Sequence, residues 1–122
     1  MQLRDQHRLE HIFDYCVEIE RTVARFGRDY ETFRSDKDYH DVVAFRILQI
    51  GELVGELSPE LRATTSDQIE WRKIKGMRNI VAHDYGNIDI EVVWQAATLD
   101  IPALKAFCEQ QLLLEGTSDG AR

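Results

Sequence analysis

Apolar residues along most of this chain recur at steps of three and four, the spacing of one face of an α-helix. Two long stretches carry the pattern near the N-terminus, a third spans residues 69–84, and a fourth fills the last third. The apolar positions outside the third stretch are Leu9, Ile12, Phe13, Cys16, Ile19, Val23, Phe26; Tyr39, Val42, Val43, Ile47, Ile50, Leu53, Val54, Leu57; and Val92, Val93, Trp94, Ala97, Leu99, Leu104, Phe107, Leu112. No segment shows sustained alternation, so the pattern predicts an all-α bundle of four to five helices.

Residues that commonly start or stop helices separate these stretches. Gly27 and Gly86 suit the ends of the first and third helices, and Pro102 should kink or interrupt the fourth. Residues 28–34 form either a short helix or an ordered loop. The residues suited to begin a helix are Ser35 or Asp36, Ser58 followed by Pro59, and Asp89.

The chain has 122 residues, which fits one domain. We expect this domain to cover residues 1–115, followed by a flexible polar tail at 116–122. The two cysteines, Cys16 and Cys108, fall within apolar periodic stretches, which indicates core thiols in a reducing compartment. Neither a signal sequence nor a membrane span is recognisable, so a cytoplasmic protein with no membrane contact is expected.

The formal net charge is −7, which argues against a general binder of nucleic acids. The charge is uneven, however, because Arg72, Lys73, Lys75 and Arg78 form a local basic run. A small basic site on an acidic body favours a selective active site or a dedicated partner over loose polyanion binding. We interpret Arg72, Lys73 and Lys75 as candidate RNA-binding residues.

The strongest candidate chemistry is the string of Arg78, four residues, His83, one residue and Tyr85. Arginine suits a phosphate, and histidine moves protons near neutral pH. Five residues on an ideal helix set Arg78 and His83 about 140° apart, so convergence on one phosphate is not forced by the spacing. Taken alone, the pattern favours the simpler interpretation of a surface arginine and a histidine near a helix C-terminus.

The surrounding residues change this interpretation, because the whole segment 71–89 resembles the HepT-like branch of the HEPN domains. That family is marked by an arginine, four residues, a histidine, one residue and a tyrosine, with a polar residue such as Asn79 after the arginine. Upstream, Ile50-Gly51-Glu52 is similar to the family's second helix, and the region from Val93 to Leu104 is similar to its last helix. The resemblance covers nearly the whole domain and implies an up-and-down HEPN-type bundle.

The resemblance implies a metal-independent endoribonuclease toxin that acts as a homodimer, needs no cofactor and leaves 2′,3′-cyclic phosphate ends. His83 would transfer protons to or from the RNA, and Arg78 would bind the phosphate and offset its developing charge. Asn79 would donate a further hydrogen bond or orient His83. One histidine cannot easily be base and acid at once, and a dimer supplies a second.

Tyr85 could be an aromatic residue that packs at the helix end. In the family, however, the matching tyrosine receives AMP from a partner nucleotidyltransferase, the antitoxin of a type VII-like toxin–antitoxin system. An attached nucleotide would place an anionic phosphate beside Arg78 and compete with RNA. The alternative function is a non-catalytic HEPN binding module that only docks a nucleotidyltransferase, which the acidic net charge slightly favours.

Other residues are less specific. Gly51 and Gly55 lie four apart within a predicted helix, which points to close approach of another helix, within the subunit or across a dimer. Glu52 is either a solvent-facing acid or a carboxylate that supports the site residues or an interface. His7 and His11 are spaced to share a metal on one helix face, but no third ligand follows, so we predict no metal site.

Overall fold

The computed structural model describes the backbone of residues 1–82 and 89–120, and side chains within 1–78 and 89–115. It confirms the all-α class, since the described residues contain helices and no strand. The helices are α1 (Leu3–Arg25), α2 (Tyr30–Ser35), α3 (Lys37–Glu56), α4 (Pro59–Thr64), α5 (Trp71–Ala82), α6 (Ile90–Gln95), the π-helical segment η1 (Ala96–Asp100) and α7 (Ile101–Gly120).

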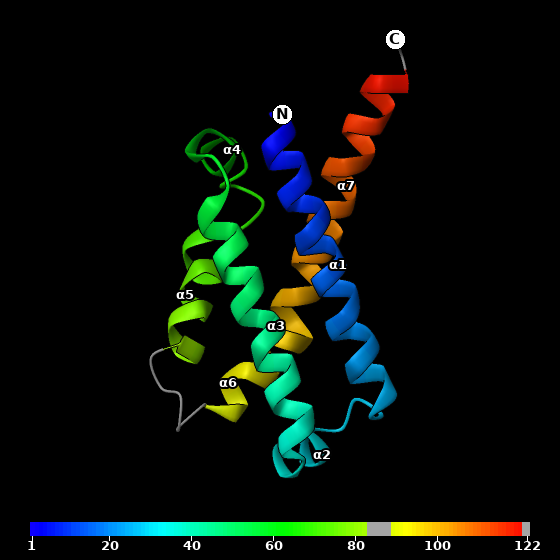
Figure 1. The fold of residues 1–122 in the computed structure, drawn as a ribbon, viewed down its shortest axis with the longest axis vertical. Helices are drawn as coiled ribbons and strands as arrows, with labels where there is room; N and C mark the ends of the chain where they lie inside the picture. Colours follow the sequence, from blue (N-terminus) through cyan, green and yellow to red (C-terminus); the bar gives the residue numbers. More distant parts are fainter. Residues whose placement is uncertain (83–88, 121–122) are drawn as a thin grey trace.

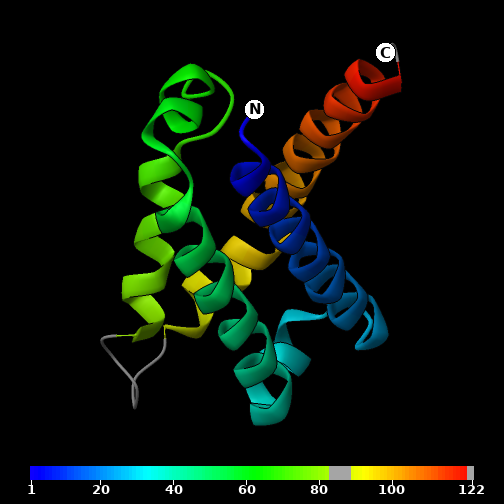
Figure 2. The same ribbon diagram turned by 45° about the horizontal axis from the view of Figure 1, so that its top comes forward.

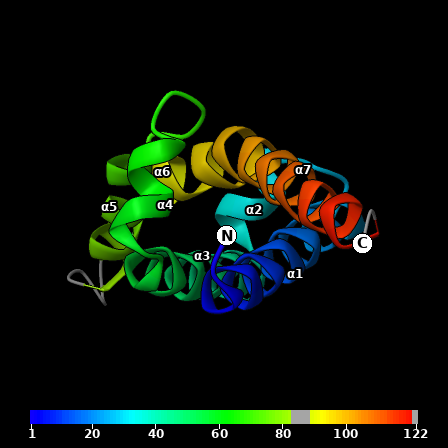
Figure 3. The same cartoon turned by 90° about the horizontal axis from the view of Figure 1, so that it is seen from above.

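The long helices run up and down, as expected (Figure 1). α1 descends, α3 returns beside it, α5 descends along the other side of α3, and α6, η1 and α7 climb back. The short helices α2 and α4 lie at opposite ends of the bundle. Viewed from above, α7 packs against α1, while α5 and α4 lie on the side of α3 away from α7 (Figure 3). No helix in the described part of the chain is long and apolar enough to cross a membrane.

The predicted helix starts and stops are confirmed where the structure describes them. Asp36 caps α3 by accepting from the Tyr39 amide at 3.1 Å, and Ser58 caps α4. Asp89 caps α6 in the same way. Gly27 ends α1 with a φ of +80°, and backbone hydrogen bonds close the turn around it.

The last helix is interrupted once. Pro102 was expected to kink or interrupt it, and the regular α-helical pattern is interrupted just before this residue, by the π-helical turn at Ala96–Asp100 between α6 and α7. A wider turn accommodates a proline, which lacks the amide proton and crowds the preceding turn. The helix extends to Gly120, past residue 115, where the folded domain was expected to end, and the domain bounds themselves stay a prediction. A single glycine such as Gly116 costs only about 1 kcal/mol and does not by itself stop a helix.

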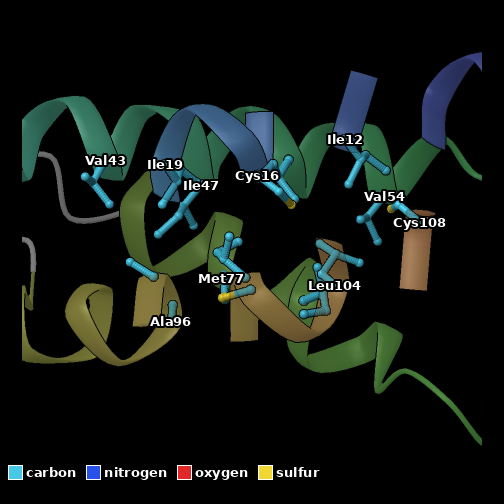
Figure 4. Close-up of a cluster of buried hydrophobic side chains, with 14 of the residues drawn as sticks. Ile12, Cys16, Ile19, Val43, Ile47, Val54, Met77, Ala96, Leu104 and Cys108 are labelled. Carbon is cyan, nitrogen blue, oxygen red and sulfur yellow. The ribbon is translucent and has the colours of Figure 1, made fainter. Parts of the chain in front are cut away.

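The core is built from one face of each long helix (Figure 4). Ile12 and Cys16 of α1 meet Ile47 of α3, Met77 of α5 and Leu104 of α7 in one cluster. Both cysteines are free and buried, which confirms them as core residues. Burial raises the pKa of the Cys108 thiol to about 12 and also raises the pKa of Cys16, so neither forms a thiolate readily near neutral pH.

Asp5 of α1 fixes α4 at the top of the bundle. It is almost fully buried, and its carboxylate accepts from the Ser58 amide at 2.9 Å and from the Ser58 hydroxyl at 2.6 Å. The Ser58 hydroxyl oxygen in turn accepts from the Leu61 amide at 3.1 Å. The start of α4 is therefore anchored to α1, which sets where α4 lies relative to α5.

Candidate functional site

α5 packs closely against Gly51 of α3, which lies directly under Arg78. A Cβ atom built on Gly51 would lie 2.7 Å from the Cβ of Arg78 and 3.3 Å from its Cα. Any larger residue would push α5 away, since the opposing atoms are the backbone and the rigid first carbon of the side chain. The glycine thus lets α3 hold the backbone of Arg78, whose side chain is exposed. Figure 2 shows α3 and α5 lying side by side.

Gly55 lies one turn further along α3 but has a different environment. A Cβ atom built there would meet only the Cε of Lys75, at 3.9 Å, which is ordinary van der Waals contact. The prediction of a close helix approach is therefore confirmed at Gly51, within the subunit. At Gly55 no such approach occurs within the described part of the chain, and an approach across a dimer stays a prediction. What Gly55 faces is the flexible stem of a cation.

Gly51→Ala should be less stable than Gly55→Ala by about 1–3 kcal/mol in the free energy of unfolding, the cost of an overpacked contact. Both changes gain the same helix propensity of about 1 kcal/mol, so this gain cancels in the comparison. Urea denaturation of the two variants measures the difference. Equal stabilities would show that α5 yields without cost at Gly51.

The exposed face of the first half of α5 is basic. Arg72, Lys73 and Lys75 are all exposed there, as the basic run in the sequence predicted. Lys73 is engaged by Asp100 of η1, with 3.1 Å between its Nζ and the carboxylate. This ion pair connects α5 to the widened turn of the last helix and leaves Lys73 less available to a ligand than its neighbours.

The start of α5 is held by Trp71. Its ring is buried and meets Phe107 of α7 edge-on, and its indole nitrogen donates to the Thr65 hydroxyl at 2.9 Å. Thr65 itself donates to the Leu61 carbonyl of α4 at 2.7 Å. Trp71 is therefore a structural anchor, and through Thr65 the start of α5 is linked to α4.

A hollow of about 880 Å³ opens between α4 and the start of α5. Its lining includes Arg72, Lys73 and Lys75, together with Arg62 of α4 and Glu70. Arg62 was missed in the sequence, because it lies ten residues before the basic run and only the fold brings it there. The hollow and Arg78 lie on the same helix, so a chain of phosphates could contact both.

The remaining predicted site residues are only partly described. Asn79 follows Arg78 within α5, while His83 and Tyr85 lie outside the described residues. Glu52 is exposed and lines a small hollow that also contains His11 and Tyr15 of α1. The structure therefore places Glu52 on the side of α3 that borders α1, and Gly51 on the side that contacts α5.

Comparison with known proteins identifies the family. A sequence model described as "Ribonuclease HepT-like" matches residues 12–111. The chain is 30% identical over 105 residues to "Probable ribonuclease HepT" of Thermococcus cleftensis, covering 80% of this chain and 92% of that protein. It is also 30% identical over 97 residues to "Putative RNase TTE0752" of Caldanaerobacter subterraneus subsp. tengcongensis, covering 80% and 84%. No solved structure matches. The matched residues include α3, α5 and the contact at Gly51. The chain therefore belongs to the HepT-like ribonuclease family.

Proposed function

We propose that this protein is a metal-independent endoribonuclease and the toxin of a type VII-like toxin–antitoxin pair, with Arg78 and His83 as its catalytic residues. The observation that carries the proposal is the contact at Gly51, which holds the backbone of Arg78 against α3 while its side chain stays exposed. A guanidinium on a fixed backbone is preorganised to receive a phosphate. Membership in a ribonuclease family supports RNA as the substrate.

RNA supplies its own nucleophile, so the chemistry needs no metal-activated water. The 2′-hydroxyl attacks the phosphorus, its proton is removed, and the bond to the 5′-oxygen breaks as that oxygen gains a proton. The products are a 2′,3′-cyclic phosphate and a 5′-hydroxyl. His83 would move the proton, Arg78 would offset the charge on the phosphoryl oxygens, and Asn79 would support one of them. Arg72, Lys73 and Lys75 would contact the flanking phosphates.

The purified protein should cut single-stranded RNA in the presence of EDTA. Cleavage through the 2′-hydroxyl fixes the product, so the 5′ fragment should end in a 2′,3′-cyclic phosphate, which mass spectrometry distinguishes from a linear phosphate. RNA with 2′-deoxy substitutions should resist cutting. Activity lost on chelation, or cleavage of the 2′-deoxy substrate, would point to metal-assisted hydrolysis instead.

The protein should also be a homodimer, because a base and an acid are needed in one cleavage and each chain offers a single His83. Light scattering at micromolar concentration should give about twice the chain mass of 14.2 kDa. Mixing inactive His83→Ala chains with unaltered chains should lower activity more than dilution does. A monomer that is fully active would refute the shared site.

The second candidate function is a non-catalytic module that docks a nucleotidyltransferase. The observation that favours it is the net charge of −7, which opposes RNA binding over most of the surface. A module of this kind would bind the partner in pull-down assays but would leave RNA uncut under every condition. The EDTA cleavage assay separates the two functions.

A further inference from the structure

The hollow between α4 and α5 concentrates positive charge on an acidic protein. Four of its lining residues are cations, from α4 and from three positions of α5, and Glu70 is the one acid among the described lining residues. The whole chain carries a net charge of −7. A local excess of this kind attracts an anion against the field of the rest of the molecule.

Much of this charge has no ion-pair partner within residues 1–78 and 89–115. Lys73 is paired with Asp100, but Arg62, Arg72 and Lys75 form no ion pair with the described residues. The Nε of Arg62 is enclosed by protein and has no hydrogen-bond acceptor among them. Among the described residues, therefore, no carboxylate is paired with the charges of Arg62, Arg72 and Lys75 in this hollow.

The cations continue from the hollow to the proposed catalytic arginine. Arg72, Lys75 and Arg78 are spaced three apart, and residues three apart are neighbours on a helix surface. At 1.5 Å per residue, the row extends about 9 Å along the axis of α5. Gly55 leaves space for the stem of Lys75 over α3, with 3.9 Å to its Cε. Successive cations of the row are therefore neighbours, and the row turns by about 120° around α5 from Arg72 to Arg78.

We propose that this hollow binds the phosphates of the RNA chain to one side of the bond cut at Arg78, with Arg62 and Arg72 as its main contacts. This inference rests on the proposed ribonuclease function. An open hollow joined to a row of cations suits a polymer better than a single nucleotide, because a basic groove that follows the backbone is how single strands are bound. The hollow therefore extends substrate contacts beyond the reacting phosphate.

The test measures binding, by fluorescence anisotropy, of a single-stranded RNA of about twelve nucleotides to protein carrying His83→Ala. Adding Arg62→Gln and Arg72→Gln should weaken binding about tenfold at physiological salt and reduce the slope of log K against log salt by about 1.4, or 0.7 per lost phosphate contact. The matched control, Arg21→Gln with Arg25→Gln on α1, removes the same charge and should change binding less than twofold. Arg21 and Arg25 are both exposed.

Two further measurements test this interpretation of the binding result. The loss should be at least fivefold larger for the long RNA than for a dinucleotide, and Arg62→Lys, with circular dichroism as a folding check, should retain most of the affinity. The proposal would be overturned if the α1 control lost as much RNA affinity as the Arg62 and Arg72 variant. It would also be overturned if that variant lost affinity equally for the two RNA lengths. Unchanged RNA binding together with lost binding of a nucleotidyltransferase would overturn it too. If the unaltered protein neither binds nor cuts RNA, the proposed function itself fails, which is a distinct outcome.

Discussion

His83→Ala should reduce RNA cleavage by about a hundred- to ten-thousandfold, the usual contribution of a positioned proton carrier. Arg78→Ala should cost about a hundred- to a thousandfold, as expected for loss of a group that stabilises transition-state charge. Arg78→Lys should recover part of that loss, because it keeps the charge but not the planar fork. Initial rates on a fluorogenic RNA measure all three variants.

Gly76→Ala provides the matched control on the same helix. A Cβ atom built on Gly76 meets nothing within 4 Å, so the substitution should leave cleavage unchanged and circular dichroism intact. The His83→Ala and Arg78→Ala proteins should show the same helical spectrum as this control. Full activity of His83→Ala would remove the proposed site, whereas a lost helical signal would assign the effect to folding.

We expect Tyr85→Phe to leave an active ribonuclease that the proposed partner nucleotidyltransferase can no longer silence. Tyr85 lies two residues after His83, so a nucleotide joined to its phenol would compete with RNA for Arg78. A free tyrosine phenol has a pKa near 10, so tyrosine is in general a poor proton carrier at neutral pH. The variant should therefore retain most of its cleavage activity while losing control.

The assay incubates each form with ATP, magnesium and the cognate nucleotidyltransferase. In the unaltered protein we expect the phenolic oxygen to attack the α-phosphate of ATP and pyrophosphate to leave, so intact mass should rise by one AMP as RNA cleavage falls. Tyr85→Phe should gain no AMP and stay active. If it is modified and silenced as fully as the unaltered protein, the control point lies elsewhere. If silencing occurs with no modification of either form, the partner acts by covering the site.

Local chemistry explains why most helix boundaries could be predicted. Asp36, Ser58 and Asp89 each accept from a nearby amide, and a short polar side chain before an apolar stretch indicates such a cap. The start of α1 at Leu3 carried no such signal, because the side chain of Gln2 makes no capping hydrogen bond. The periodicity therefore indicated the helix only from about Leu9.

Features that depend on how two helices pack together were harder to predict from the sequence. The paired glycines predicted a close approach, but only the packing distinguishes Gly51, under Arg78, from Gly55, under Lys75. The contribution of Arg62 to a basic hollow depends on where Asp5 and Trp71 hold α4 and α5. The roles of His83 and Tyr85 remain predictions from the resemblance and from their chemistry.

The widened turn at Ala96–Asp100 has a consequence for comparing relatives. A π-helical turn holds one more residue than an α-helical turn, and each residue of an α-helix advances the face by about 100°. Deleting one residue there would restore a regular α-helix. It would also rotate Val93, which is buried, away from the face that it shares with Ile101. Relatives without the wide turn should therefore show a single-residue gap at this place. An ungapped alignment across it would pair core positions with surface ones.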